Sequence, residues 1–187
     1  MHCFSIRLTA FGELMDILLA GGTSHFLKLL VDKLNKEGHR VFQLTEEPKT
    51  EKKLPKVFET YHFPYDDTCI SDVIGSIQPD VTVFLGAFDT NFKWDKAQSR
   101  PAVYTAGVFN ILMAQNALGK GRFIYLSSEE VFQGEYAGEI NCDDFCAVYT
   151  DKGQAVSAGE EICKTYRQMG KDVVVLRLDH LYGIPKN

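Results

Sequence analysis

The chain has 187 residues, of which 45% are hydrophobic and 24% are charged, and its formal net charge is -5. This length and composition predict one globular domain that is large enough to bury a substantial core. The acidic balance, without a Lys/Arg cluster, argues against a nucleic-acid-binding surface. No apolar run approaches the roughly 18 residues that a membrane-spanning helix needs. We therefore expect neither nucleic acid nor membrane as a partner.

Residues 1–14 precede the first predicted strand. They contain one early arginine and no long apolar core, so a signal peptide is not expected. Met15 lies immediately before the strand. We interpret 1–14 as an N-terminal extension, either from an alternative start or from a preceding domain, and 15–187 as the folded domain.

The five cysteines are Cys3, Cys69, Cys142, Cys146 and Cys163. Cys142 and Cys146 are four residues apart in a predicted loop, with no second pair and no histidine nearby. We therefore favour reduced thiols over a zinc site and expect no metal. Reduced thiols fit a cytoplasmic protein.

A short apolar run over 16–20 ends in a glycine turn, and an amphipathic helix follows at once. Its apolar residues recur at helical spacing, and Gly38 stands where a glycine closes a helix. In such a strand–turn–helix unit the free N–H groups of the helix face a pyrophosphate. The predicted cofactor contacts in this turn are Gly21, Gly22, Thr23, Ser24, His25 and Phe26. For His25, a plain surface histidine is the favoured alternative to a phosphate donor.

The dinucleotide-binding motif has glycine at three positions, which in this register are Gly21, Ser24 and Leu27. Serine at the second position is a mild loss, because that glycine lets the backbone approach the pyrophosphate. Leucine at the third is a larger one, because that glycine lets the helix pack close to the strand. The motif therefore predicts the strand–turn–helix fold. The loss of two of its three glycines argues against intact cofactor binding.

The second strand, over 40–45, ends where an NAD-binding domain usually places an acidic residue for the ribose 2′-OH. Thr45 occupies that place, and Glu46 and Glu47 follow. Glu46 either reaches the ribose from one residue later or lies in a solvated turn. Nothing basic at the strand tip favours NADP, although lysines follow in the polar loop 49–56. NAD and NADP both stay open.

Strands and helices alternate along the rest of the chain. We predict strands over 57–63, 80–85, 122–127 and 173–178, and helices over 70–77, 100–118 and 150–169. Asp67 or Thr68 is the expected cap of the first of these helices. The strand over 80–85 ends at Leu85, Gly86 and Ala87, where small residues would let backbone lie near a nucleotide.

Two long connections separate these elements. The loop 88–98 carries Phe88, Phe92 and Trp94, which form either a ligand-facing lid or, as we favour, local packing. The loop 133–148 is rich in glycine and acid. The alternation predicts an α/β fold with a doubly wound, mostly parallel sheet in three α/β/α layers, a Rossmann fold. Ligands of such sheets bind at the carboxyl edge of the strands.

The order of several short motifs resembles the extended short-chain dehydrogenase/reductase family, the NAD-dependent epimerase/dehydratase group. The resemblance covers about 16–183, and the run over 125–134 is most similar to the dTDP-4-dehydrorhamnose reductase branch and its non-catalytic relatives. The matching motifs are residues 19–23 (LAGGT), 79–81 (PDV), 85–87 (LGA), Gly107 with Asn110, 125–132 (YLSSEEVF) with Gly134, 158–161 (AGEE), 177–178 (RL) and 181–183 (LYG).

The resemblance implies a catalytic Ser or Thr, a Tyr and a Lys four residues after it. A free tyrosine has a pKa of about 10, and a nearby cation makes it a usable acid/base at neutral pH. Ser128 matches the hydroxyl position. If the AGE motif is aligned, the tyrosine position falls on Lys152 and the lysine position on Val156. If Tyr149 is the tyrosine, the lysine position falls on Gly153.

Tyr149 and Lys152, three residues apart on one helix face, form a displaced pair in one hypothesis. In the favoured alternative Tyr149 is an aromatic residue at the start of the helix and Lys152 is solvated. In the alternative for Ser128, its hydroxyl forms a hydrogen bond with the backbone of the loop. Glu129 and Glu130 resemble the acid pair of dehydratases, but a solvated acidic turn is favoured.

The family carries a C-terminal substrate-binding region after the LYG motif, whereas this chain ends at Asn187. The chain is therefore either a fragment of a longer protein or one that has lost its substrate half. In both cases we expect a nucleotide-binding domain without this region, with impaired catalysis and cofactor binding, and with a nucleotide sugar as the ancestral substrate. The alternative is a catalytically inactive regulatory or partner-binding module. In this family the helices over 100–118 and 150–169 often pair subunits, so a homodimer is a further hypothesis.

Overall fold

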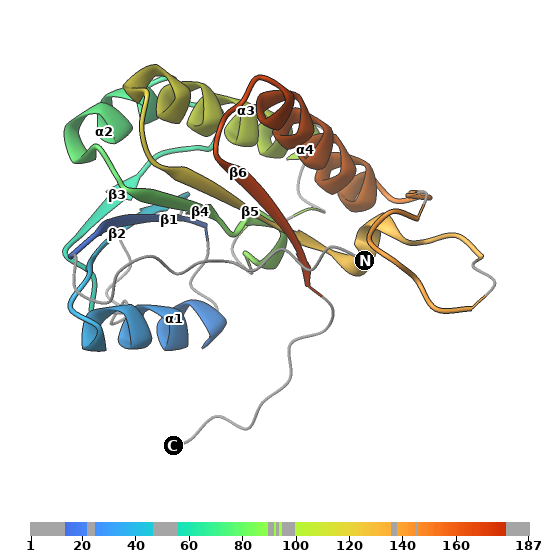
Figure 1. The fold of residues 1–187 in the computed structure, drawn as a ribbon, viewed down its shortest axis with the longest axis horizontal. Coiled ribbons are helices and arrows are strands. Elements are labelled where there is room, and N and C mark those ends of the chain that lie inside the picture. The colour runs from blue at the N-terminus through green and yellow to red at the C-terminus, as the bar shows by residue number, and fades with distance from the viewer. Residues whose placement is uncertain are drawn as a thin grey trace.

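The computed structural model describes residues 14–21, 25–46, 56–89, 92, 94, 100–135, 138–144 and 146–178. In these ranges six strands form one sheet in the order β3-β2-β1-β4-β5-β6 (Figure 1). All five strand pairings are parallel. The strands are β1 (Asp16–Ala20), β2 (Arg40–Thr45), β3 (Glu59–His62), β4 (Val81–Phe84), β5 (Arg122–Ser128) and β6 (Val173–Leu178).

Helices cover both faces of this sheet. Helix α1 lies on one face, and α2, α3 and α4 lie side by side on the other (Figure 1). The predicted three-layer, doubly wound α/β fold is therefore confirmed. The helices are α1 (His25–Lys36), α2 (Ile70–Ile77), α3 (Arg100–Leu118) and α4 (Asp151–Gln168), with two short 3-10 helices, η1 (Gly86–Phe88) and η2 (Glu129–Val131).

The side chains of β1 divide the core in two. Leu18 and Ala20 belong to the larger cluster beneath α2, α3 and α4, whereas Ile17 and Leu19 pack with Leu27 of α1. All of these residues are buried. Successive side chains of a strand point to opposite faces, so a strand covered on both sides is apolar throughout. This explains the short unbroken apolar runs in the sequence.

Several predicted boundaries agree with the structure. Helix α3 spans the predicted 100–118 and strand β6 the predicted 173–178. Helix α1 ends as expected at Gly38, whose φ is +89°. The N–H of Gly38 donates to Asn35 (3.0 Å) and that of His39 to Leu34 (3.1 Å), which satisfies the last carbonyls of the helix.

Two local predictions are wrong. Strand β3 is shorter than the predicted 57–63, because only four of its residues pair with β2. The residue before α2 is Cys69, which makes no side-chain capping bond. Asp67 instead accepts a hydrogen bond from the N–H of Cys69 (2.8 Å), so its carboxylate closes the preceding turn.

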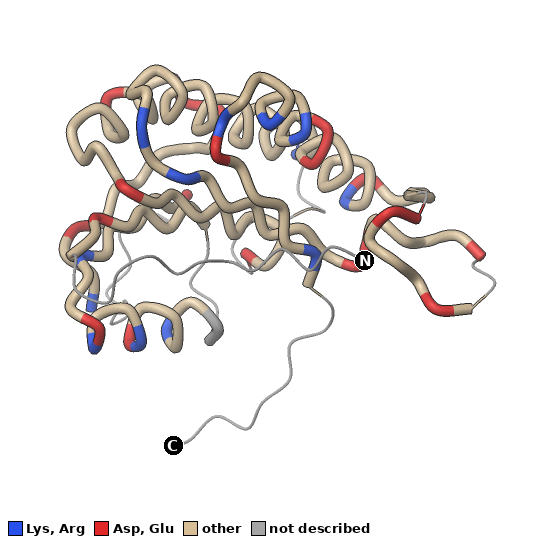
Figure 2. The backbone as a smooth tube through the Cα atoms, viewed as in Figure 1, with Lys and Arg blue, Asp and Glu red and all other residues tan. Residues whose placement is uncertain are grey.

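Charged residues of both signs occur along α1 and α4 (Figure 2), whereas α2 carries only Asp72 and α3 only Arg100. The segment 129–148, after β5, is different, because it carries six acidic residues and no lysine or arginine. Among the described residues, Lys152 of α4 pairs with one of these acidic residues, Glu130.

Two buried tyrosines join the sheet to the helix layer. The hydroxyl of Tyr125, on β5, donates to the carbonyl of Val156 on α4 (2.9 Å) and lies 2.8 Å from the hydroxyl of Tyr104 on α3. Because the Tyr125 proton goes to Val156, Tyr104 is the donor between them. Burial raises the pKa of both hydroxyls well above the usual value. They therefore stay protonated and serve as structural hydrogen bonds.

Gly159 makes room for this chain of hydrogen bonds. A Cβ atom at position 159 would overlap the Tyr125 hydroxyl and lie 2.7 Å from its Cζ. We predict that Gly159→Ala lowers the free energy of unfolding by about 2–3 kcal/mol, because a close-packed core does not absorb an added methyl group. Urea unfolding measures the loss.

Gly75→Ala in α2 is the matched control, because Gly75 is helical and its Cβ would meet no atom within 4 Å. This substitution should raise stability by about 0.5–1 kcal/mol through helix propensity alone. Equal effects of the two substitutions would contradict the assigned packing.

Candidate functional site

The carboxyl ends of β2, β1 and β4 are joined by backbone hydrogen bonds. The N–H of Gly21 donates to Leu44 (2.9 Å), and the N–H of Leu85 donates to Ala20 (2.7 Å). The strand order reverses at β1, since β2 follows on one side and β4 on the other. Parallel sheets bind ligands in the crevice beside such a reversal. The candidate site is therefore this edge.

Gly21 is required at this edge by its conformation and by its neighbours. Its φ is +122°, which side chains rarely adopt, and a Cβ would lie 3.0 Å from the carbonyl carbon of Leu85. Helix α1 begins four residues later, and its first turn carries no acidic residue. A glycine cradle and a helix N-terminus without negative charge fit the pyrophosphate of a dinucleotide.

The structure describes only part of the predicted turn. Gly22, Thr23 and Ser24 lie outside the described residues, and so do the side chains of His25 and Phe26, which open α1. Their predicted cofactor contacts stay predictions.

The predicted contacts on β2 and β4 are at the candidate edge. Thr45, Leu85, Gly86 and Ala87 are all buried. A Cβ on Gly86 would lie 2.6 Å from the ring of Phe84 and 2.7 Å from that of Tyr104. Ring packing therefore accounts for glycine here, a reason that the sequence did not indicate.

Glu46 at the tip of β2 is engaged by protein groups. Its Oε2 lies 2.5 Å from Nη2 of Arg100, the first residue of α3. Its Oε1 accepts a hydrogen bond from the N–H of Tyr65 (3.1 Å). The side chain of Glu46 is 13% exposed. Glu46 is therefore part of a mostly buried ion pair, which the solvated-turn alternative did not foresee.

Aromatic residues support this ion pair. The Arg100 guanidinium carbon lies 3.8 Å from the ring centre of Phe92, a cation–π contact. Phe92 stacks on Tyr65 at 5.7 Å and meets Trp94 edge-on at 4.8 Å. Phe92 is 2% exposed, which confirms local packing for this ring. Burial, and then the nearby Asp89, raise the pKa of Tyr65, whose hydroxyl donates to Asp89 (2.7 Å).

A second group of predicted residues lies where β5 ends. Ser128 is 2% exposed, and its Oγ accepts a hydrogen bond from the N–H of Glu130 at 3.4 Å. Ser128 thus opens η2, as the backbone-bonding alternative expects. Glu130 pairs with Lys152 through Oε1 and Nζ, 3.0 Å apart. This contact brings the start of α4 to the turn that follows Ser128.

Tyr149 lies just before α4 and is 73% exposed. Its backbone N–H donates to Oε1 of Gln133 (2.5 Å), and Thr150 caps the helix by accepting from the N–H of Gly153 (3.0 Å). The structure thus places Ser128 and Lys152 around Glu130, with the Tyr149 ring in solvent.

A match to a family model assigns the chain to a protein family. The model of the NAD-dependent epimerase/dehydratase family matches residues 17–186, nearly the whole chain. The chain belongs to this family.

Solved structures of similar fold agree with this assignment. Bordetella bronchiseptica WbmG in complex with NAD is 22% identical, covers 92% of this chain, and superposes with a TM-score of 0.73. The UDP-glucose 4-epimerase of Thermotoga maritima with UDP-glucose is 20% identical over 87% of this chain, with a TM-score of 0.73. At this identity the likeness establishes the shared fold.

The chain spans about half the length of these proteins, 55% of WbmG and 55% of the Thermotoga enzyme. A search of curated protein sequences finds no match. None of the helices in the described part of the chain is both long enough and apolar enough to cross a membrane.

In neither alignment is the family's lysine position occupied by a lysine. Val156 is fully buried, and its carbonyl accepts the Tyr125 hydroxyl. A Cβ on Gly153 would lie 2.7 Å from the carbonyl oxygen of Glu130. A lysine side chain therefore has no room at 153, and one at 156 would start inside the core. Lys152, which replaces the family's tyrosine in one alignment, forms an ion pair with Glu130 in the turn after Ser128.

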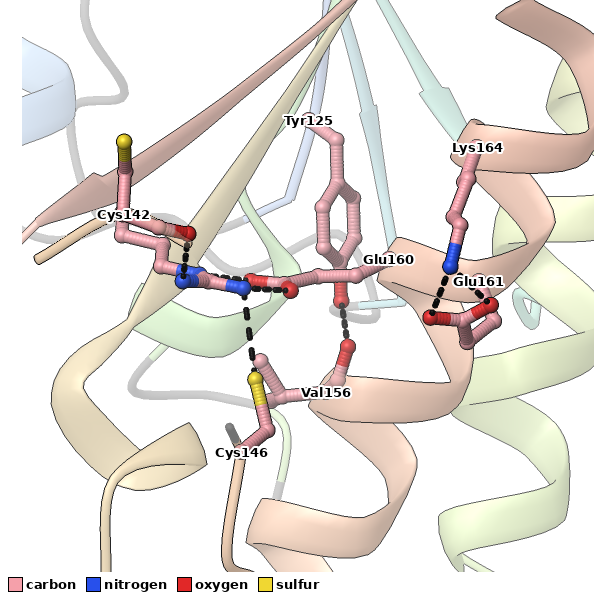
Figure 3. A network of polar contacts seen from close by, with 8 residues as sticks. Tyr125, Cys142, Cys146, Val156, Glu160, Glu161 and Lys164 are labelled. Atoms are coloured by element: carbon pink, nitrogen blue, oxygen red, sulfur yellow. Dashed lines mark hydrogen bonds and ion pairs between the residues drawn. The ribbon is translucent and has the colours of Figure 1, made fainter. Parts of the chain in front are cut away.

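Two motif residues of the family, Arg177 and Glu160, form a further ion pair. Arg177 on β6 donates to both carboxylate oxygens of Glu160 on α4, at 2.8 and 2.7 Å (Figure 3). The same guanidinium donates to the carbonyl of Cys142 (2.9 Å) and to the sulfur of Cys146 (3.3 Å). The sequence motifs named both residues of the pair but did not indicate that they meet.

This network anchors the acidic loop to the sheet. The guanidinium carbon of Arg177 lies 4.8 Å from the ring centre of Phe132, at the start of the loop. Burial raises the pKa of the Cys146 thiol, and the nearby Arg177 only partly offsets that. Cys146 therefore stays a thiol that accepts a hydrogen bond. The four cysteines in the described ranges are all free.

We predict that Glu160→Gln destabilises the protein by about 2 kcal/mol, because it leaves the Arg177 charge partly buried without its counter-ion. The side chains of this pair are only 10% and 23% exposed. Urea unfolding measures the loss, and hydrogen exchange of residues 138–148 should accelerate with it.

Glu161→Gln on the next residue is the control. Its partner Lys164 and Glu161 itself are 61% and 69% exposed, so this substitution should cost less than about 0.5 kcal/mol. A cost for Glu160→Gln as small as that of the control would refute the anchoring role of Arg177.

Proposed function

We propose that this chain is the nucleotide-binding part of an epimerase/dehydratase-family protein, and that it binds NAD or NADP while its catalysis is impaired. The site supports this at two separate places. The carboxyl edge of β2, β1 and β4 retains the Gly21 cradle, whereas the turn after β5 lacks a tyrosine–lysine pair in the family's spacing.

The observation that carries the proposal is the close contact of α4 with the turn after Ser128. Proton transfer by a tyrosine at neutral pH needs a nearby cation, because the unperturbed pKa is about 10. Gly153 has no room for a side chain, and Val156 is buried. Lys152 is already paired with Glu130. Tyr149 and Lys152 are three residues apart, one fewer than the family's spacing, and the Tyr149 ring is exposed.

The substrate class that we propose is a nucleotide sugar. Structures of similar fold include WbmG in complex with NAD and UDP, and an epimerase with UDP-glucose. Within the family, the run over 125–134 supports a place near the dTDP-4-dehydrorhamnose reductase branch. This chain spans about half the length of these structural relatives.

The second candidate function is an inactive regulatory or partner-binding module, with the chain itself as one partner. Phe109 and Met113, one turn apart on α3, are each 45% exposed. Helix α3 would pair subunits through these side chains in a homodimer. We expect light scattering to give twice the monomer mass, and Met113→Lys to shift it to the monomer mass; a monomer before substitution would end the hypothesis.

Cofactor binding is tested by titrating the protein with NADH and NADPH while following Trp94, the only tryptophan. We expect saturable binding with a dissociation constant below about 1 mM for at least one of them. Gly21→Ala should weaken that binding at least tenfold, because the new Cβ would press on Leu85 where the pyrophosphate backbone contact forms. Gly75→Ala should leave it unchanged.

No saturable signal at millimolar dinucleotide would refute the proposal. Measured turnover of a nucleotide sugar that is lost in both Ser128→Ala and Tyr149→Phe would leave cofactor binding standing and contradict impaired catalysis.

A further inference from the structure

The tip of β2 carries a basic group that is not apparent from its local sequence. Arg100 reaches Glu46 from 54 residues further along the chain, at the first residue of α3. We propose that Arg100 selects a dinucleotide with a 2′-phosphate, so that this chain prefers NADP(H) to NAD(H). This inference rests on the proposed function, since it requires that a dinucleotide binds at this edge.

The position of the pair relative to the glycine cradle is the first argument. The N–H of Gly21 donates to Leu44, two residues before Glu46 (2.9 Å). The pyrophosphate cradle and the Glu46–Arg100 pair therefore lie on adjacent strand ends. In a dinucleotide fold the group at the end of the second strand meets the 2′ position of the adenosine ribose.

The state of Glu46 is the second argument. An acidic residue at this position favours NAD when its carboxylate is free to accept the ribose hydroxyls. Here one carboxylate oxygen accepts from Tyr65 and the other from Arg100. The side chain is 13% exposed. Glu46 is thus committed to the protein, and its carboxylate is not free to accept the ribose hydroxyls.

The state of Arg100 is the third argument. Within the described residues its guanidinium donates one hydrogen bond, to Glu46, and its Nε is buried without a partner. Phe92 lies against the guanidinium at 3.8 Å and fixes its plane. A planar, oriented guanidinium is a side chain well suited to hold a phosphate. The side chain is 20% exposed, so a ligand can reach part of it.

The test compares ligands that differ only in the 2′-phosphate. The full chain is titrated with NADPH and NADH, and with adenosine 2′,5′-bisphosphate and AMP as adenosine-half probes, followed by Trp94 fluorescence or calorimetry. We expect each 2′-phosphorylated ligand to bind at least tenfold more tightly than its counterpart. In Arg100→Gln this ratio should fall below about threefold, while binding of NADH and AMP changes less than twofold.

Two further variants distinguish a loss of phosphate recognition from a folding defect. Glu46→Gln/Arg100→Gln removes both charges together and should lose the preference as Arg100→Gln does, with an unchanged melting temperature. Arg122→Gln is the matched control, because it also removes an arginine from an ion pair, here with Asp172. Arg122 is the first residue of β5 and lies at the opposite edge of the sheet. It should keep the full preference.

Equal affinity for the two ligands of each pair, a preference for NADH, or an equal loss for both ligands in Arg100→Gln would overturn the inference and leave the proposed function intact. If neither dinucleotide nor either adenosine probe binds, the proposed function fails and the inference fails with it.

Discussion

All six strands run in one direction, and this constraint decides what the molecule can do. Each crossover returns the chain to the same starting edge, so every strand delivers its last residue to the opposite one. Gly21, Glu46, Gly86 and Ser128 are far apart in sequence and share this edge for that reason alone. The short hydrogen bonds from Gly21 to Leu44 and from Leu85 to Ala20 hold the three central strand ends in register.

The elements themselves were accessible from sequence because their signals are local. Helical spacing of apolar residues gave α2 and α3, and unbroken apolar runs gave the central strands. Contacts across the fold were not accessible in this way. Residue spacing does not reveal the ion pairs Arg100–Glu46 and Arg177–Glu160. Each pair joins segments that come together only in the tertiary structure.

Glycine shows the same division between local and distant causes. Gly38 ends a helix for a reason that its neighbours reveal, a positive φ that closes the last turn. Gly159 leaves room for the ring of Tyr125, and Gly86 for that of Tyr104 as well as for its near neighbour Phe84. Sequence inspection placed Gly86 near a nucleotide, but the rings of Phe84 and Tyr104 already account for its size. The role of such a glycine is known only when its distant neighbours are.

Gly153 decides whether a lysine can stand four residues after Tyr149 in this fold. Its missing side chain lets the first turn of α4 rest against the carbonyl of Glu130. A lysine grafted there, four residues after Tyr149, would push the helix off that carbonyl, and with it the Thr150 cap that the N–H of Gly153 completes. A lysine in the family's spacing after Tyr149 therefore demands a shifted helix, a change of backbone that no single substitution supplies.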